Sequence, residues 1–271
     1  TLTRDKAVLV LEDGKRYVGH AYGTKGVSFG EIVFATGMTG YQETLTDPSY
    51  SGQIVIMTAP HIGNTGANDL DMESRRIWVS GYVVRDPSRI VSNFRAERSL
   101  DNDLEREGVV GISGIDTRAL TRHIRSQGAM RAGVFSGAEF ELDEATQLER
   151  VRSGEQMAGR NLSAQVSTEQ PYVVPAQGQS YGTVAILDLG VKTSTVNYIA
   201  ERGFDAHVLP QSVTAADVLA LNPVALFFSN GPGDPSASDR HVELLREVLK
   251  GDAESGSAVG NHTRRDGVGW S

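Results

Sequence analysis

A regular alternation of short apolar runs and amphipathic segments begins at Thr183, and it limits the possible folds more than any other feature of the sequence. The apolar runs predict three buried strands, at 184–187, 206–209 and 224–228. The segments between and after them have helical spacing, at 192–202, 215–221 and 239–250. Gly203 is typical of a helix end, and Thr214 of a helix N-cap. This order predicts a parallel, doubly wound α/β sheet.

The predicted sheet ends early. In its last helix we expect Val242, Leu245 and Leu249 to face inward, because their spacing places them on one side of the helix. After Lys250 the sequence becomes polar and rich in glycine, and no fourth strand is recognisable. We therefore predict an incomplete sheet, in which the apolar faces of the first and third strands lack cover.

The first 135 residues have a different pattern, with apolar runs separated by glycines, which is typical of a β-rich domain. Strands are predicted at 7–11, 17–22, 31–35, 53–58, 77–84, 109–113 and 129–135. The Asp-Gly pair at 13–14 predicts a hairpin turn. One helix is predicted at 117–127, with Asp116 as its N-cap and with Leu120 and Ile124 on its buried face.

Residues 136–182 differ from both neighbouring regions, since they are rich in Ser, Gln, Gly and Pro around a weak amphipathic helix at 144–152. We interpret them as a connection. The predicted division is a domain at 1–135, a connecting segment at 136–182, a partial domain at 183–254 and an aberrant tail at 255–271. The fold class is α/β overall: a β-rich α+β N-terminal domain, followed by an incomplete doubly wound parallel α/β domain.

Composition excludes several functions. The sequence has no cysteine, which excludes disulfides, thiolate metal sites and cysteine nucleophiles, and its six histidines show no metal-binding spacing. The net charge is −8 without a basic cluster, so a nucleic-acid partner is not expected. Neither a bilayer-spanning run nor the apolar core of a signal peptide is present, and we expect a cytoplasmic protein without a membrane partner.

The most informative segment for chemistry is Phe227 to Pro235, which reads Phe-Phe-Ser-Asn-Gly-Pro-Gly-Asp-Pro. It follows a predicted parallel strand, and open α/β proteins bind ligands at that edge of the sheet. Gly231 and Gly233 leave room for close backbone approach, and their N–H groups can face an oxyanion. An ordinary strand-to-helix turn uses the same residue types, so spacing alone leaves both interpretations open.

The Ser-Asn-Gly-Pro-Gly-Asp-Pro run resembles the oxyanion-side loop of class I (triad) glutamine amidotransferases. Residues 34–50, Phe-Ala-Thr-Gly-Met-Thr-Gly-Tyr-Gln-Glu-Thr-Leu-Thr-Asp-Pro-Ser-Tyr, resemble the hallmark segment of the carbamoyl-phosphate synthetase small-subunit family. Further segments resemble that family at 9–14, 59–64, 92–95, 114–122 and 184–192. The resemblance covers about residues 7–250 and implies that the second domain is a flavodoxin-like glutaminase domain.

The resemblance also implies a reaction. In the family a cysteine attacks the side-chain amide of L-glutamine, and a histidine held by a glutamate moves the proton. The ammonia passes to a large subunit, where bicarbonate and ATP convert it to carbamoyl phosphate for arginine and pyrimidine synthesis. ATP and a divalent metal are expected on that large subunit, and no cofactor in this chain. By motif, Ser49, Gly231 and Gly233 correspond to glutamine contacts, although the residue type of Ser49 alone favours a turn residue after Pro48.

The sequence departs from the family where the nucleophile is expected. No Gly-Ile-Cys elbow follows the helix at 239–250, so no residue is assigned a catalytic role, and His262 is expected to be solvated. We interpret the chain as truncated before the catalytic cysteine, by a frameshift, a natural early end or deliberate shortening. The expectation is a glutaminase-inactive small subunit that pairs with the large subunit as a heterodimer.

Two alternatives stay open. The chain is either an enzyme subunit without its nucleophile or a non-catalytic binding or scaffolding protein that retains the docking domain. The charged residues of the predicted helix at 117–127 also have two interpretations. Asp116, Arg118, Arg122 and Arg125 form either a face for the large subunit or an ordinary capped, soluble helix.

Overall fold

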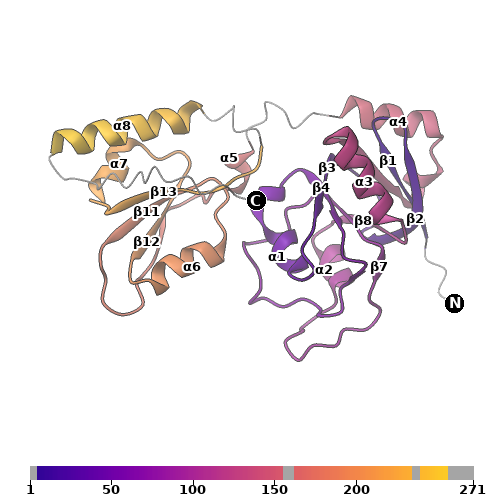
Figure 1. The fold of residues 1–271 in the computed structure, drawn as a ribbon, viewed down its shortest axis with the longest axis horizontal. Helices are drawn as coiled ribbons and strands as arrows, with labels where there is room; N and C mark the ends of the chain where they lie inside the picture. Colours follow the sequence, from indigo (N-terminus) through magenta and orange to yellow (C-terminus); the bar gives the residue numbers. More distant parts are fainter. Residues whose placement is uncertain (1–4, 155–161, 234–238, 256–271) are drawn as a thin grey trace. The chain divides into compact units, whose positions relative to one another are not determined.

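The computed structural model describes residues 5–154, 162–233 and 239–255 of the chain. Its contacts divide the chain into two compact units (Figure 1). Unit 1 extends to Val166 and also includes residues 190–194 and the described part of 230–237, and unit 2 comprises the remaining residues from Ser167 on. This division places residues 136–166 with unit 1, whereas the domain boundaries inferred from composition remain a prediction.

Unit 1 is built on a closed barrel in the order β1-β2-β8-β6-β4-β3-β9. Its strands are β1 (Lys6–Leu11), β2 (Arg16–Gly23), β3 (Val27–Ala35), β4 (Gln53–Met57), β6 (Gly81–Val83), β8 (Val110–Ser113) and β9 (Met130–Ser136). The run β3-β4-β6-β8 is parallel, and the other pairs are antiparallel. A separate short pair consists of β5 (His61–Ile62) and β7 (Asp86–Pro87). The β-rich prediction is therefore confirmed.

The strand predicted at 77–84 is shorter than expected, because only Gly81–Val83 joins the barrel. The N–H of Trp78 donates to the carbonyl of Leu45 at 3.0 Å, and Val79 forms an isolated bridge with Ser51. These backbone groups are satisfied by a neighbouring loop and helix, so the ladder begins only after them. Trp78 itself is buried, as expected of a core residue.

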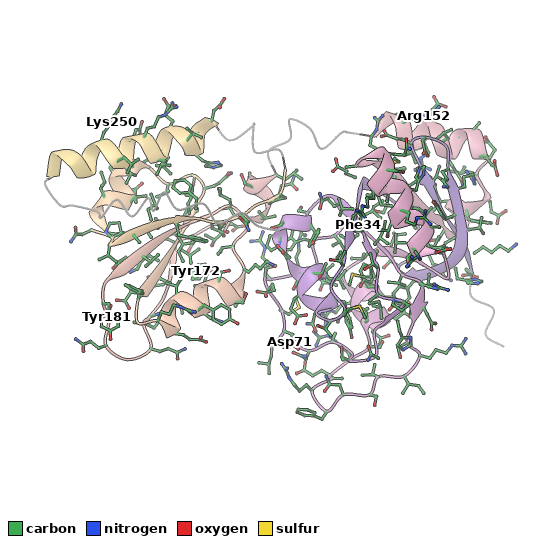
Figure 2. The ribbon with its side chains drawn as sticks, in the orientation of Figure 1. Phe34, Asp71, Arg152, Tyr172, Tyr181 and Lys250 are labelled. Atoms are coloured by element: carbon green, nitrogen blue, oxygen red, sulfur yellow. The ribbon has the colours of Figure 1, made fainter. Side chains whose placement is uncertain are left out.

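The barrel core follows from side-chain alternation, since every second residue of each strand points to the same side. Buried members come from most of the barrel strands: Ala7, Leu9, Leu11, Ile32, Ile54, Ile56, Val83, Val110, Ile112, Met130, Ala132 and Val134. Leu120 and Ile124 of α3 (Thr117–Gln127) belong to the same cluster, and Phe34 packs against it (Figure 2). Asp116 caps α3 by accepting the N–H of Ala119 at 3.0 Å, which confirms the predicted helix and its cap.

The other side of the strands carries the remaining helices of unit 1. α1 (Tyr41–Thr46) and α2 (Leu100–Arg106) contribute to a second apolar cluster around the fully buried Tyr82. α4 (Glu144–Ser153) packs Val151 against β1 and β9, close to its predicted position. Short turns complete the unit: η1 (Pro48–Tyr50), η2 (Gly137–Glu141) and α5 (Ser163–Val166).

Unit 2 contains a four-stranded sheet in the order β10-β12-β11-β13. Its strands are β10 (Tyr172–Val174), β11 (Thr183–Asp188), β12 (Asp205–Pro210) and β13 (Ala225–Phe228), and its helices are α6 (Thr193–Glu201), α7 (Ala215–Ala220) and α8 (Asp239–Ser255). β12, β11 and β13 are parallel, as predicted, with α6 on one face and α7 and α8 on the other (Figure 1). The antiparallel edge strand β10 falls inside the predicted connecting segment and was not expected.

Two predictions about cover in unit 2 need correction. Residues 184–187 do not lack cover, because β11 is the inner strand between β12 and β13 and is buried under helices on both faces. Only the edge strand β13 behaves as expected, with Phe227 39% exposed. The sheet order, which the sequence pattern does not contain, decides which strand is central.

The inward face of α8 was also predicted wrongly. Val242, Leu245 and Leu249 are 47%, 38% and 52% exposed, whereas Leu244 and Val248 are buried in the cluster shared with α7. α8 carries two neighbouring apolar stripes with helical spacing, and packing against α7 selects one of them. None of the helices in the described part of the chain is long and apolar enough to span a bilayer.

His241 on α8 gives unit 2 a pH dependence. The side chain is 5% exposed, and its Nδ1 has no hydrogen-bond partner among the described residues. Burial and the adjacent Arg240 guanidinium lower the pKa of His241. The unfolded chain binds this proton near pH 6.5, at about the ordinary value, and the folded unit binds it only at lower pH. Its contribution to stability is therefore complete above that pH and is lost as the pH falls.

We expect opening of unit 2 to become easier as the pH falls from about 7 to about 5.5, because the pKa of His241 is lowered in the folded unit, and we expect His241→Leu to flatten this dependence. Hydrogen exchange of β11 and β12 amides, corrected for the intrinsic rate, measures the opening. An unchanged pH slope in the His241→Leu chain would contradict the assignment. Exchange in the unit 1 barrel is the internal control.

Candidate functional site

The turn that carries Ser49 is set by a buried carboxylate. Asp47 is 6% exposed and caps η1, where its Oδ1 accepts the N–H of Ser49 at 2.9 Å. Ser49 is half-buried, and its hydroxyl makes no hydrogen bond within the described part of the chain. The backbone of this turn is thus fixed by Asp47, while the hydroxyl stays available to a ligand.

Helix α1, which precedes this turn, is anchored to the loop that follows β5. The Gln42 side-chain amide donates to the carbonyl of Asn68, and its Oε1 accepts the N–H of Asn68 at 3.1 Å. Thr46 Oγ1 accepts the N–H of Glu73 at 2.9 Å. Buried polar groups that pair in this way hold a backbone rigidly. The loop after β5 therefore holds α1 in place, and with it the Ser49 turn that follows α1.

Residues 190–194 contact Asp47 and Glu73 through five polar contacts, and we call this part of unit 1 the corner. Lys192 Nζ lies 2.7 Å from Asp47 Oδ2. The Glu73 carbonyl accepts from the N–H and the hydroxyl of Thr193, at 2.7 and 3.0 Å. The Glu73 carboxylate accepts from the N–H and the hydroxyl of Ser194, at 3.1 and 3.0 Å. These contacts explain why the segment groups with unit 1.

Gly190 brings the Ser49 turn next to the loop at 230–233. Its φ is +131°, a conformation that L side chains rarely adopt. A Cβ at this position would lie 3.2 Å from Pro48 Cβ, 3.3 Å from the Asn230 carbonyl oxygen and 3.3 Å from Gly231 Cα. The predicted residues Ser49 and Gly231 therefore flank one glycine, and Gly233, with φ +97°, lies two residues further along the same loop.

The charges at this corner are well defined near neutral pH. Burial alone would lower the pKa of Lys192, but the ion pair with Asp47 and the nearby Glu73 and Tyr50 outweigh it, so this pKa is raised. Burial and the Asp47 carboxylate raise the pKa of Tyr50. The lysine is therefore cationic and the tyrosine neutral. The corner offers a hydroxyl, backbone N–H groups and an ammonium ion, which suit a small polar ligand.

No group of three His, Asp or Glu side chains in the described ranges is placed to hold a metal ion. The described side chains of the corner supply hydrogen-bonding groups and charge. The whole sequence supplies no thiol.

Two protein-family models match this chain, one in its first half and one in its second half. Residues 9–134 match the family model described as the carbamoyl-phosphate synthase small chain, CPSase domain, and residues 185–253 match class-I glutamine amidotransferase. The chain is 58% identical to the carbamoyl phosphate synthase small chain of Streptomyces coelicolor over 268 residues, covering 98% of this chain and 70% of the relative. The chain belongs to the carbamoyl phosphate synthase small chain family.

Other members are similarly close. The small chain of Streptomyces avermitilis is 63% identical over 243 residues, which cover 90% of this chain and 64% of the relative. That of Bifidobacterium longum (strain NCC 2705) is 56% identical over 259 residues, which cover 91% of this chain and 63% of the relative. The chain thus spans less than two thirds of the length of these two relatives.

Within this family framework, four residues of the corner were missed by the sequence analysis: Asp47, Glu73, Gly190 and Lys192. A usable signal existed for two of them. Asp before Pro-Ser is typical of a capped turn, and a glycine shortly after a buried strand is typical of close backbone approach. Glu73 and Lys192 carried no such signal, because their partners are far away in the sequence.

We expect Lys192→Met to destabilise unit 1 by about 1–2 kcal/mol, because the buried Asp47 carboxylate loses its cation, although the partly exposed lysine reduces the cost. In the double variant Asp47→Asn/Lys192→Met most of this loss should be recovered. Urea unfolding of all four chains of the cycle measures the coupling. The exposed pair Lys25–Asp5 serves as control, and Lys25→Met should change nothing measurable. Equal effects at both lysines would refute the expectation.

Proposed function

We propose that this chain is the glutamine-handling component of a carbamoyl phosphate synthase and that it docks on the large chain of that enzyme. The observation that carries the proposal is the corner of unit 1, where Gly190 lies against both Pro48 and Gly231 in a chain that belongs to the small chain family. The two segments lie far apart in the sequence, so their meeting at one glycine supports a shared ligand site.

In this proposal L-glutamine binds at the corner. The Ser49 hydroxyl donates to or accepts from the ligand, and the N–H groups of Gly231 and Gly233 face the oxygen of its amide. Lys192 and Asp47 neutralise one another and hold the turn. Their role is to position Ser49. Because the lysine and the aspartate pair with one another, the ligand meets no net charge from these two side chains.

The finer assignments belong to the same proposal. The second unit has a flavodoxin-like glutaminase fold in this proposal. The chain and the large chain form a cytoplasmic heterodimer, and the large chain binds ATP and a divalent metal. The product, carbamoyl phosphate, would serve arginine and pyrimidine synthesis. Since residues 1–271 contain no cysteine, this polypeptide binds glutamine without hydrolysing it. A second candidate, favoured by that same absence, is a non-catalytic protein whose role is docking alone.

The test uses the full chain and its cognate large chain. Co-elution in size-exclusion chromatography is expected, and the complex should make carbamoyl phosphate from ammonium ions and not from glutamine. Failure to co-elute, with both chains folded by circular dichroism, would refute the docking proposal.

Glutamine binding separates the two candidates. Titration calorimetry should show glutamine binding that Ser49→Ala weakens about tenfold, the loss of one hydrogen bond. Ser51→Ala, two residues further along the same turn, is the matched control. Docking without any glutamine binding would favour the non-catalytic docking protein.

A further inference from the structure

A patch of unpaired arginines lies outside the candidate glutamine site. Arg118, Arg122 and Arg125 follow one another at i, i+4 and i+7 on the exposed side of α3, opposite the buried Leu120 and Ile124. Arg85, exposed after β6, faces the same hollow. We call these four side chains (Arg85, Arg118, Arg122 and Arg125) the arginine patch.

The arginine patch surrounds open space. A hollow of about 630 Å³ is lined by all four arginines together with the hydroxyl-bearing Thr58 and Thr121. A second hollow of about 600 Å³ is lined by Arg122 and Arg125 again, with Lys15 and His123. The two hollows share two arginines, so the cationic surface is continuous along α3.

The chain does not neutralise this patch. Several other arginines of unit 1 are held by carboxylates, as in Arg98 with Asp103 and Arg131 with Glu12. Within the described part of the chain, none of the four patch side chains forms an ion pair or a hydrogen bond. Three acids that are close to α3 or Arg85 in the sequence or in contact with α3 have other partners: Asp116 caps α3, Asp86 pairs with His61, and Asp13 pairs with His123.

Solubility alone does not account for this arrangement. The chain is already soluble by its net charge of −8, and like charges at i, i+4 on a helix destabilise it. Uncompensated cations concentrated on one face of an acidic chain therefore point to an anionic partner outside it. The exposed guanidinium groups are not held by buried neighbours, which argues against a tight small-anion site. Four charges in one patch also make a poor track for a nucleic-acid backbone.

We propose that the arginine patch is the surface on which an acidic stretch of the large chain docks. This assignment rests on the proposed function and names the interface. Arginine is enriched at protein interfaces because its planar fork binds carboxylates with two hydrogen bonds and its stem packs on apolar surface. The hollows give room for the partner's side chains between the guanidinium groups.

The decisive experiment compares two triple variants with the same change of charge. Arg118→Glu/Arg122→Glu/Arg125→Glu reverses three charges of the patch. Lys6→Glu/Arg89→Glu/Arg246→Glu reverses three exposed charges outside it. Binding of each full chain to the immobilised cognate large chain is followed by interferometry at about 50 mM and about 300 mM salt, which differ in screening length.

The patch variant should associate at least about 30-fold more slowly at low salt and lose most of the salt dependence, and the control should stay within about threefold of the unaltered chain. If the unaltered chain binds and the patch variant binds as well, the inference is wrong while the proposed function stands. Equal losses in both variants would show a general charge effect and also overturn it. No binding by the unaltered chain would refute both proposals.

A milder variant protects the test against misfolding. Arg118→Ala/Arg122→Ala removes two charges and places a strong helix former at exposed positions. It should weaken association about fivefold to tenfold without changing the circular dichroism spectrum. Unchanged binding by this folded variant would count against the arginine patch. Binding of inorganic phosphate or of a nucleic-acid duplex, stronger than that of the large chain, would do the same.

Discussion

A polypeptide of residues 1–271 is expected to release no ammonia from glutamine above the buffer blank. Loss of the nucleophile from a catalytic triad costs about 10⁴–10⁶ in turnover, and this sequence has no cysteine to serve as one. The Ser49 hydroxyl does not substitute for it, because no histidine hydrogen-bonds to it among the described residues. Ammonia release from labelled glutamine, followed by NMR with and without the large chain, measures the expected loss.

The same reasoning predicts that a thiol-directed glutamine analogue leaves the mass of the protein unchanged. The small chain of Streptomyces coelicolor, 58% identical, is assayed in parallel as the comparator. Turnover by residues 1–271 that survives repeated purification would contradict the prediction and would require a nucleophile other than a thiol.

Gly111→Ala is expected to damage the barrel strongly although it adds only one methyl group. Gly111 of β8 pairs with Tyr22 of β2 on one side and with Tyr82 of β6 on the other. An added Cβ would lie 2.6 Å from the Tyr22 carbonyl oxygen and 3.0 Å from that of Tyr82, closer than packed atoms approach. Because strands on both sides of β8 belong to a closed barrel, neither can retreat, and we expect a loss of about 3 kcal/mol.

Urea unfolding monitored by tryptophan fluorescence measures this loss, since Trp78 belongs to unit 1. The matched control is Gly154→Ala at the end of α4, where φ is −61° and the nearest contact of a new Cβ is a carbonyl oxygen at 3.3 Å. This change should stay within about 0.5 kcal/mol. If both variants unfold at the same urea concentration, the steric argument at Gly111 is wrong.

The secondary structure was predictable where one local signal agreed with another. α3 begins and ends at the expected residues because Asp116 caps it, Gly128 terminates it, and its buried positions have helical spacing. α7 likewise starts after the Thr214 cap, where a reciprocal bond with Asp217 completes a capping box. The two-residue strands β5 and β7 have no local sequence signal, because each exists only through its pairing with the other, which is distant in the sequence.

The candidate site was predictable only through resemblance. Ser, Asn, Gly and Pro at Ser49 and at 229–233 are ordinary turn residues, and nothing in their spacing separates a ligand loop from a plain turn. The residues that hold the corner together, Glu73 and Lys192, are charged side chains of a type that is mostly solvated. Only the folded chain shows that their partners are a helix start and a buried carboxylate.

The sequence by itself determined the strand and helix alternation after Thr183, the β-rich character of the first region and the absence of any thiol. Each of these properties depends on residue identity and near-neighbour spacing, which a linear pattern contains. The tertiary structure alone decided the order β10-β12-β11-β13, the choice of Leu244 and Val248 as the buried stripe of α8, and the closure of the barrel. These depend on which surfaces meet, and several surfaces of this chain are similar enough in apolar content that only packing distinguishes them.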